Sequence, residues 1–484
     1  MTANSSIWQD VPFHGRAKVL EARWQKMCAL YLPRAPKTSV WRYSHAKRRP
    51  QPSFGWKLHI SATILNAPGV LKRIGPFLGA RGVRFKAPRS LAEVHKLNSG
   101  LYYGYSQIGK IITIYPTSDN EAVFLARRLH QLTRRFSGPA VPFDLRFTNT
   151  SNVYYRFGAF QHLEMDHDGR RILGVHAPNG ELVPDFREQP KPDWVSDPFE
   201  GHRPRSKAAK QEASSPLRVT RALAQRGKGG VYQALDLTSG KPRLCLLKEG
   251  RKNGEITWDG RDGAWRVRNE NRVLARLSAC GVPVPQVHSC FELGGNDYLV
   301  MEYLNGETLH ELLSRRRRRL AFARVLGYGI QIATFMSQMH RAGWAWRDCK
   351  PTNIIVTRHG QLIPIDFEGA APVDRPDHSL WGTPGFTPPE WRRRKIAHGV
   401  TDDLYALGSM LYLLLTGHVY DHAQPQIINK LRRNVPPALQ RVVQSLLCDE
   451  ATKRPAAEFA CAQLTAILLK YSKQPIKLER AKAA

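Results

Sequence analysis

The segment WRDCKPTN at residues 346–353 decides how the C-terminal half of this chain folds. It places a carboxylate, an ammonium group and a carboxamide close together, on Asp348, Lys350 and Asn353. In such a loop the carboxylate can accept the proton of a hydroxyl group, the lysine can steady a γ-phosphate, and the asparagine can ligate Mg2+. The segment therefore predicts transfer of a phosphoryl group to a hydroxyl group.

Segments on either side supply further parts of such a site. Downstream, IPIDFEG ends an apolar run in Asp366, whose carboxylate suits the metal that bridges the β- and γ-phosphates. Upstream, LCLLK ends in Lys248, which we expect to hold the α- and β-phosphates. We expect Glu270, in the helical pattern WRVRNENRVLARL, to orient this lysine.

The segment GKGGVYQA at residues 227–234 is a glycine-rich turn that leads into a strand. Glycine carries no Cβ, so backbone at such a turn can approach and cover nucleotide phosphates. We therefore expect Gly227, Gly229 and Gly230 to bind the nucleotide, with ATP as phosphoryl donor and Mg2+ as its metal.

In this order and spacing the segments resemble the two-lobed protein kinase fold over residues 217–469. FTPPE, which ends at Glu390, looks like the A-P-E element of that family, and DLYALG with Asp403 is a further match. The resemblance implies an ion pair between Glu390 and Arg454, in the segment KRP.

Some positions depart from the family pattern. Ala224 and Arg226 stand where the first two loop glycines usually lie, and Trp346 replaces the usual histidine before Arg-Asp. Glu368 replaces the glycine of D-F-G, which removes a residue free at positive φ and puts a flipping activation segment in doubt. The activation segment carries two hydroxyl side chains, Ser379 and Thr383.

Composition favours a protein of several domains with anionic partners. The 484 residues carry 73 Lys and Arg against 40 Asp and Glu, a formal net charge of +33. The seven cysteines are scattered without a CxxC pair, so we expect neither a disulfide framework nor structural zinc. Because neither a signal segment nor a stretch long enough to span a bilayer is present, we expect a cytoplasmic protein without a membrane partner.

Two basic runs, at residues 315–319 and 392–395, could dock an acidic substrate. Single-sign runs are more often solvated faces of helices or loops, and this is the interpretation we favour. Because no aromatic residues interleave with the first run, we expect no nucleic-acid partner.

Patterning divides the chain into five parts and predicts an α+β fold class. We expect an irregular lead-in over residues 1–50, an α+β domain over 51–176, a linker over 177–216, the kinase-like domain over 217–470 and a basic tail over 471–484. Periodicity within the first domain predicts, in chain order, strand 56–62, helix 67–81, strand 83–86, helix 90–98, strand 110–115, helix 120–136 and strand 152–157.

The first of these strands, WKLHISA, has one polar face. Alternation places Lys57, His59 and Ser61 on one side and the apolar residues between them on the other. Further cations stand on or beside other strands, namely Lys86, Lys110 and Arg156. If these side chains converge, they form a phosphate pocket suited to β-elimination from phosphoserine or phosphothreonine, with a lysine whose pKa is lowered by neighbouring cations as the base.

A second resemblance covers about residues 41–200. The segments GWKLHISAT, GVRFK, LNSG, GKIITIYP, YYRFGAF and PDWVSDPF, in this order, resemble the N-terminal lyase region of class III and class IV lanthipeptide synthetases, in which a kinase follows the lyase. The resemblance implies the following roles: Lys86 as general base, His59 as general acid, Lys57 and Arg156 as phosphate ligands, and Lys110 as a further ligand. Full-length members continue into a zinc-binding cyclase domain, which does not fit after residue 469, so we expect any ring closure to come from a separate cyclase.

Three functions remain open at this point. The first is a bifunctional dehydratase that phosphorylates Ser or Thr in a precursor peptide and then eliminates the phosphate. The second is a Ser/Thr signalling kinase whose N-terminal domain only binds phosphorylated or acidic partners. The third, a nucleic-acid-binding module with a decayed kinase, is disfavoured by the intact phosphoryl-transfer residues. The first two differ in whether the cations of the N-terminal strands converge.

Overall fold

The computed structural model describes residues 15–45, 51–161, 163–202, 216–238, 240–316, 318–375, 381–390 and 399–472. These residues form two compact units. One lies within Phe13–Val267 and Phe291–Tyr298, and the other lies within Arg268–Cys290 and Leu299–Ala484. Helices and strands are mixed in both, so the α+β fold class is confirmed. The first strands of the kinase-like region belong to the same unit as the N-terminal domain.

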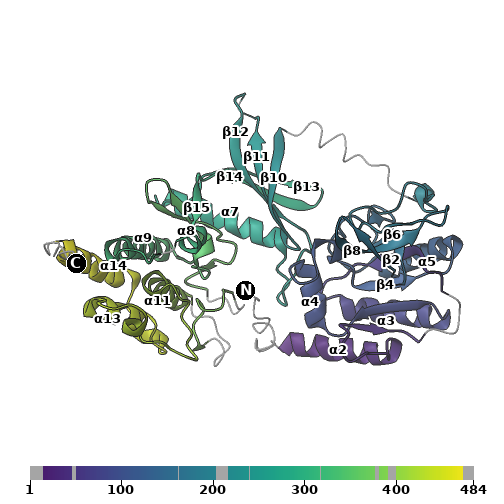
Figure 1. The fold of residues 1–484 in the computed structure, drawn as a ribbon, viewed down its shortest axis with the longest axis horizontal. Helices are drawn as coiled ribbons and strands as arrows, with labels where there is room; N and C mark the ends of the chain where they lie inside the picture. Colours follow the sequence, from purple (N-terminus) through teal and green to yellow (C-terminus); the bar gives the residue numbers. More distant parts are fainter. Residues whose placement is uncertain are drawn as a thin grey trace, which may run out of the picture. The chain divides into compact units, whose positions relative to one another are not determined.

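The N-terminal domain is built on a six-stranded sheet in the order β1-β3-β4-β2-β6-β5, with antiparallel neighbours (Figure 1). Its strands are β1 (Trp41–Tyr43), β2 (Phe54–Ile60), β3 (Arg84–Pro88), β4 (Ile112–Tyr115), β5 (Leu145–Arg146) and β6 (Val153–Ala159). The helices between them are α3 (Ala67–Ala80), α4 (Leu91–Ser99) and α5 (Asp119–Thr133), with a 3-10 turn η1 (Tyr105–Gln107). The alternation of strands and helices expected from periodicity is present.

Local sequence explains where the helices begin and which face of β2 is buried. The side chains of Ser90 and Ser118 each accept a hydrogen bond from the backbone three residues on, which caps α4 and α5. Trp56, Leu58 and Ile60 are at most 2% exposed and pack in the hydrophobic core with residues of α3 and α5. The opposite face of β2 is therefore the one that carries the polar side chains.

The irregular lead-in expected over residues 1–50 is wrong for residues 15–31, whereas residues 1–14 and 46–50 lie outside the described residues. Residues 15–31 form helix α2 (Gly15–Tyr31), which packs on α3. Trp24 and Cys28 are fully buried in the core, and Gly75 of α3 permits the close approach because a Cβ there would lie 2.5 Å from the ring of Tyr31. Few residues of α2 are buried, so its apolar periodicity is too sparse to recognise in sequence.

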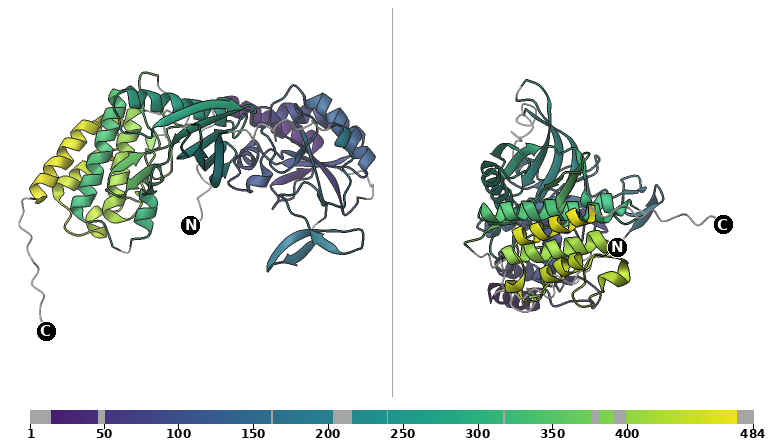
Figure 2. Two further views of the ribbon diagram at one scale, coloured as in Figure 1. Left: turned by 90° about the horizontal axis from the view of Figure 1, so that it is seen from above. Right: turned by 90° about the vertical axis from the view of Figure 1, so that its left-hand side faces the viewer.

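The first part of the expected linker also belongs to the N-terminal domain. Strands β7 (Glu164–His167), β8 (Arg170–His176) and β9 (Leu182–Pro184) form a small antiparallel sheet that projects from the domain (Figure 2). The chain then returns to the core through Phe199, whose ring lies 4.0 Å from that of Tyr155, and ends in the turn η2 (Glu200–His202). A single buried side chain such as Phe199 in a proline-rich segment produces no hydrophobic periodicity, so the sequence did not reveal this contact. Residues 203–215 lie outside the described residues.

The kinase-like region begins with three antiparallel strands, β10 (Leu217–Arg226), β11 (Gly229–Asp236) and β12 (Arg243–Gly250). Strands β13 (Val287–Leu293) and β14 (Asn296–Glu302) complete a five-stranded sheet in the order β10-β11-β12-β14-β13. Helix α7 (Gly263–Ala279) lies between β12 and β13 in the chain.

The remaining residues form a helical unit. Its helices are α8 (Leu309–Ser314), α9 (Phe322–Arg341), α11 (Val400–Thr416), α12 (Ile428–Leu431), α13 (Pro437–Leu446) and α14 (Ala457–Ser472), with the turns η3 (Pro351–Asn353) and η4 (Ala451–Lys453). Its short strands are β15 (Gly306–Thr308), β16 (Trp344–Ala345), β17 (Ile354–Thr357), β18 (Leu362–Pro364) and β19 (Ala371–Pro372). Helix α11 is almost entirely buried among α9 and α13, and α14 packs along α9 (Figure 2).

The basic runs and the basic tail expected from the sequence are only partly within the described residues. The described arginines of the run at 315–319 are exposed, as expected of a solvated segment, whereas residue 317, the run at 392–395 and residues 473–484 of the expected tail lie outside the described residues. Among the described helices, none is long and apolar enough to cross a membrane.

The anchoring role of Phe199 is testable by truncation. Replacing Phe199, which is 0% exposed, with alanine should lower the free energy of unfolding of the N-terminal unit by about 3–5 kcal/mol, because it leaves a cavity in the core. Phe124→Ala is the control; Phe124 is 42% exposed, and its truncation should cost less than about 1 kcal/mol. Chemical denaturation followed by tryptophan fluorescence measures both, and equal effects would show that the 185–202 segment is not part of this core.

Candidate functional site

One face of the six-stranded sheet gathers the polar residues expected from the sequence. Lys86 on β3 and His59 on β2 both lie opposite Thr113 of the intervening strand β4. Directly paired residues of antiparallel strands point to the same side of a sheet, and neighbouring strands are about 4.8 Å apart. Lys86 and His59 therefore flank Thr113 on one face, with their backbones about 10 Å apart.

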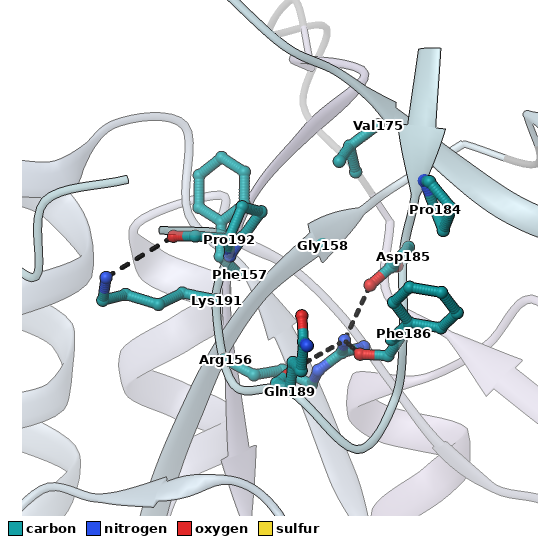
Figure 3. Close-up of a pocket in the computed structure, with 10 residues that line it drawn as sticks. All are labelled: Arg156, Phe157, Gly158, Val175, Pro184, Asp185, Phe186, Gln189, Lys191 and Pro192. Carbon is teal, nitrogen blue, oxygen red and sulfur yellow. Dashed lines mark hydrogen bonds and ion pairs between the residues drawn. The ribbon is translucent and has the colours of Figure 1, made fainter. Parts of the chain in front are cut away.

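Lys57 and Arg156 form a second row on this face. They are paired across β2 and β6, and Lys57 lies two residues before His59, so its side chain points to the same side. Arg156 is 5% exposed, and its Nη2 donates to Asp185 Oδ1 at 2.6 Å and to the carbonyl of Phe186 at 2.9 Å (Figure 3). Its buried Nε has no hydrogen-bond partner among the described residues, so Arg156 retains a donor for an anion.

The space beside Arg156 is small. The cavity lined by Arg156, Asp185 and their neighbours has a volume of about 10 Å³, which is about the size of one water molecule. The carboxylate of Asp185 already pairs with the guanidinium group of Arg156 in this space. A phosphate must displace this carboxylate or bind at the neighbouring cations.

Asp144 joins two of the expected residues, although no sequence pattern pointed to it. Its Oδ2 lies 2.6 Å from His59 Nδ1, and its Oδ1 accepts a hydrogen bond from Lys110 Nζ at 2.7 Å. The side chain of Asp144 is completely buried, and it stands just before the short strand β5. Because an ionised carboxylate can only accept, Nδ1 of His59 carries the proton and Nε2 is left for a substrate.

Burial changes the pKa values of the lysines on this face. It lowers the pKa of Lys57 from 10.5 to about 7, helped by Arg156, Lys86 and Arg187 and opposed by Asp185. It lowers the pKa of Lys86 to about 8, helped by Arg187. The expected lowering is present, but its main cause is loss of hydration rather than neighbouring cations. Arg187, which sequence reasoning missed, adds to the positive charge.

His59 is held neutral in the same environment. Burial lowers its pKa from 6.5 to about 4, while the carboxylate of Asp144 opposes the shift. The pKa of Asp144 itself lies below its ordinary value because His59 and Lys110 outweigh the effect of its burial. An acid role for His59 therefore requires an anionic substrate that raises this pKa.

The second expected site surrounds Asp348. Its Oδ2 accepts hydrogen bonds from Lys350 Nζ at 2.7 Å and from Asn353 Nδ2 at 3.0 Å. Its Oδ1 accepts a hydrogen bond from the hydroxyl group of Thr383 at 2.8 Å, and Lys350 also donates to that hydroxyl oxygen at 2.9 Å. Thr383 is thus part of the site, and Ser379 lies outside the described residues.

The residues around Asp348 fit a divalent cation. Burial raises the pKa of Asp348, the carboxylate of Asp366 raises it further, and Lys350 opposes both effects. The carboxylates of Asp348 and Asp366 repel each other, so a cation bound between them and the nucleotide phosphates would be favoured. Within the described residues there is no cluster of three or more His, Cys, Asp or Glu that could hold a metal. The candidate protein ligands for Mg2+ are therefore Asn353 and Asp366, with nucleotide phosphates supplying further oxygens.

Trp346, the departure from the usual histidine, supports the metal-binding segment. Its ring is fully buried, lies 5.8 Å from that of Phe367, and its Nε1 donates to the carbonyl of Asp366 at 3.4 Å. The backbone amides of Trp346 and Arg347 donate to the buried carboxylate of Asp403, at 2.8 and 2.6 Å. The indole therefore supports the Asp366 segment through both packing and a hydrogen bond.

The conformation of this segment does not require the glycine that the family usually has at position 368, where this chain has Glu368. The left-handed residue of this segment is Asp366, with φ of 66°, and Glu368 is not among the described residues with positive φ. The amide of Phe367 donates to Glu270 Oε1 at 3.2 Å, and Asn269 Nδ2 donates to the carbonyl of Glu368 at 3.2 Å. Helix α7 therefore supports the segment, and the expected ion pair of Glu390 and Arg454 is also present at 2.6 Å.

The glycine-rich turn is a two-residue connection between β10 and β11, since Arg226 pairs with Gly229. Lys248 lies directly opposite Val231, so the expected phosphate-binding lysine shares a face with the start of β11. Backbone crowding requires glycine at two positions. A Cβ would lie 1.7 Å from the carbonyl oxygen of Glu249 at Gly229 and 1.6 Å from that of Asn98 at Gly227.

Comparison with known proteins identifies a family for each of the two regions. The family model described as "Protein kinase domain" matches residues 220–464, and the one described as "RamC, N-terminal domain" matches residues 33–212. The chain is 32% identical to the probable SapB synthase of Streptomyces coelicolor over 384 residues, which covers 75% of this chain and 40% of that protein. It is 29% identical to the serine/threonine-protein kinase pkn3 of Myxococcus xanthus over 52% of this chain and 49% of that kinase. The chain thus spans less than half the length of these relatives.

The lowered pKa of Lys86 can be measured directly. In protein labelled with 13C at the lysine side chains, the Cε resonance of Lys86 should titrate near pH 8, because burial disfavours the ammonium form. The spectrum of Lys86→Met assigns the resonance, and Lys72→Met, which removes an exposed lysine of the same domain, should leave the resonance that titrates near pH 8 in place. Titration of Lys86 together with the exposed lysines would contradict the geometry described for this face.

Proposed function

Because the chain belongs to the protein kinase family and carries a RamC N-terminal domain, we propose that it dehydrates a peptide in two steps. It first phosphorylates a Ser or Thr side chain and then eliminates the phosphate to leave dehydroalanine or dehydrobutyrine. The observation that carries the proposal is the row of Lys86, Thr113 and His59 on one sheet face, in a chain that also holds the Asp348 network. Lys57, Lys86 and Arg156 share this face, which supports elimination of phosphate over a domain without clustered cations.

The relatives support this function. The relative named as a probable SapB synthase aligns over 75% of this chain, so its similarity extends over parts of both domains. The segments quoted above also resemble the lyase and kinase regions of class III and class IV lanthipeptide synthetases. Relatives named as serine/threonine-protein kinases match the kinase region and support Ser or Thr as the acceptor.

Phosphoryl transfer would take place at the Asp348 network. Asp348 accepts the proton of the Ser or Thr hydroxyl as its oxygen forms a bond to the γ-phosphorus, and the bond from that phosphorus to the β-bridging oxygen breaks to release ADP. Lys350 steadies the γ-phosphoryl oxygens, and Lys248 holds the α- and β-phosphates with Glu270 as its orienting carboxylate. Asn353 and Asp366 would hold Mg2+, which when bound neutralises charge on the β- and γ-phosphates.

Elimination would take place on the polar face of the six-stranded sheet. Neutral Lys86 removes the α-proton of the phosphorylated residue, the Cβ–O bond breaks, and the electron pair of the former C–H bond forms the new double bond. The oxygen of the departing phosphate takes its proton from His59. Lys57, Lys110 and Arg156 bind the phosphate, and Lys86 returns its proton to water.

The substrate itself supplies the charge that this chemistry needs. His59 is neutral in the free protein, so it can act as an acid only after a phosphate dianion beside it has raised its pKa. Lys86, with a pKa of about 8, is partly neutral near pH 7 and increasingly so above it. The rate constant for elimination should therefore rise with pH up to about 8, as Lys86 loses its proton, and fall at higher pH, where His59 loses the proton that it must donate.

Two substitutions should stop the reaction at different points. With ATP, Mg2+ and a Ser/Thr-containing precursor peptide, wild type should give peptide lighter by one water per modified residue, whereas Lys86→Met should accumulate phosphopeptide because the α-proton stays in place. Asp348→Asn should not phosphorylate the peptide, yet it should still eliminate phosphate from a synthetic phosphothreonine peptide. Intact-mass spectrometry distinguishes these products.

Lys72→Met is the matched control, since it removes an exposed lysine of the same domain and should dehydrate the peptide as wild type does. Stable phosphopeptide from wild type, without any dehydrated product, would refute the lyase assignment. The N-terminal domain would then be a module that binds phosphopeptides beside a signalling kinase.

A further inference from the structure

The glycine-rich turn of the kinase region is hydrogen-bonded to the N-terminal domain. The backbone amide of Gly227 donates to the carbonyl oxygen of Ser99 at 2.9 Å. Ser99 is the last residue of α4, is 1% exposed, and is followed by Gly100 in the left-handed conformation. An amide that could cover nucleotide phosphates is therefore engaged by a domain that is not part of the kinase.

The distribution of glycines around the turn matches this contact. Gly227 is needed because a Cβ there would lie 1.6 Å from the carbonyl oxygen of Asn98. Gly254 and Gly263 allow the same close packing, since a Cβ would lie 2.3 Å from the carbonyl oxygen of Gly227 and 1.7 Å from that of Lys228, respectively. The usual loop glycines are absent at positions 224 and 226. The glycines present are thus those that let neighbouring backbone close around the turn.

The segment between β12 and α7 anchors the contact more widely. The amide of Arg251 donates to the carbonyl of Lys228 at 2.8 Å, so the segment follows the turn closely. Further along, Ile256 and Trp258 pack against the hydrophobic core of the N-terminal domain. The guanidinium group of Arg251 also lies 5.0 Å from the centre of the Tyr105 ring. The turn and the N-terminal domain are therefore held together by packing as well as by one hydrogen bond.

Two connections lead from this contact to the residues of the lyase face. Asn98, which is 2% exposed, donates through Nδ2 to the carbonyl of Ala62 at 3.0 Å, and its Oδ1 accepts from the amide of Gly109 at 3.1 Å. Ala62 follows β2 with its His59, and Gly109 directly precedes Lys110.

The second connection passes through aromatic rings. The ring of Tyr105, which contacts Arg251, lies 5.8 Å from that of Phe143. Phe143 directly precedes Asp144, the carboxylate shared by His59 and Lys110, and holds a φ of 65°. The turn is therefore connected, through contacts and neighbouring residues in the chain, to both sides of the His59, Asp144 and Lys110 group.

We propose that the hydrogen bond from Gly227 to Ser99 is a latch through which nucleotide binding and the ordered lyase face compete. An amide donates one strong hydrogen bond, so a nucleotide phosphate that takes the amide of Gly227 must displace the carbonyl of Ser99. Release of Ser99 loosens the neighbouring Asn98 and its anchors beside His59 and Lys110. This inference rests on the proposed function. The latch separates the two steps, because elimination takes place while Gly227 donates to Ser99 and phosphoryl transfer takes place after this hydrogen bond has opened. The coupling is reciprocal, since the nucleotide and a phosphopeptide bound at the lyase face would each lower the affinity for the other by the same factor.

Opening the latch should strengthen nucleotide binding. Asn98→Ala removes the two side-chain hydrogen bonds that hold the end of α4, and with it Ser99, to the N-terminal domain. The dissociation constant for the Mg2+ complex of a non-hydrolysable ATP analogue should therefore fall about three- to tenfold, the factor given by one hydrogen bond of ordinary strength. Asn66→Ala is the matched control, because Asn66 also donates to a backbone carbonyl of this domain, that of Ser137, and should leave the constant unchanged. Calorimetric titration of the full chain measures all three proteins. An unchanged or larger dissociation constant for Asn98→Ala would overturn the proposal.

A second measurement uses wild type alone and so does not depend on whether Asn98→Ala folds. Saturating ATP analogue should speed hydrogen exchange at the amide of Gly109, which is bonded to Asn98 Oδ1, because the open latch frees that side chain. Exchange that is unchanged or slower would contradict the latch. Neither measurement involves elimination, so failure to dehydrate a peptide would refute the proposed function without affecting this result, and the reverse also holds.

Discussion

The polar sheet face depends on the contacts that the buried carboxylate of Asp144 makes with His59 and Lys110. That face carries Lys57, Lys86, Lys110 and Arg156 in a largely dehydrated environment, where like charges repel and each ion loses hydration. Asp144 compensates for part of this charge and, by bonding to both His59 and Lys110, fixes their positions. The remaining positive charge is what a phosphate dianion would neutralise. Under the proposed function, this charge would be in place before the phosphorylated substrate binds.

The two sites of the chain handle phosphate in opposite ways. The Asp348 network concentrates carboxylates, so it needs a cation together with the nucleotide, and Trp346 supports the Asp366 segment by packing on Phe367. The sheet face concentrates cations and neutral amines, which under the proposed function would bind a phosphorylated side chain without a metal. Phosphate installed at the first site would then make the peptide a ligand for the second. The contact between Gly227 and Ser99 offers a physical reason why the two would not act at the same moment.

The sequence predicted most strands and helices between residues 54 and 159, and the order of the kinase segments, because these signals are local. Alternation along β2 identified the polar face with Lys57 and His59, and the order of the kinase segments identified Asp348, Lys350 and Asn353, which the structure brings together. Asp144, Arg187 and Thr383 escaped prediction because each acts through a contact distant in sequence and belongs to no periodic pattern. Helix α2 and the 185–202 segment were missed for a related reason, since a few buried anchors such as Trp24 and Phe199 hold them. The usual glycine positions gave no hint of the contact at Gly227, which only the packed backbones reveal.

The fate of the oxygen atoms shows whether the polar face eliminates phosphate or hydrolyses the phosphate ester. Asp348→Asn protein should be incubated with a synthetic phosphothreonine peptide in water enriched in 18O, and the released phosphate and the peptide should both be weighed by mass spectrometry. Because elimination breaks the Cβ–O bond, we expect phosphate without 18O and an equal amount of peptide that has lost water relative to threonine. Phosphate that contains 18O together with intact threonine peptide, or no release of phosphate, would contradict it.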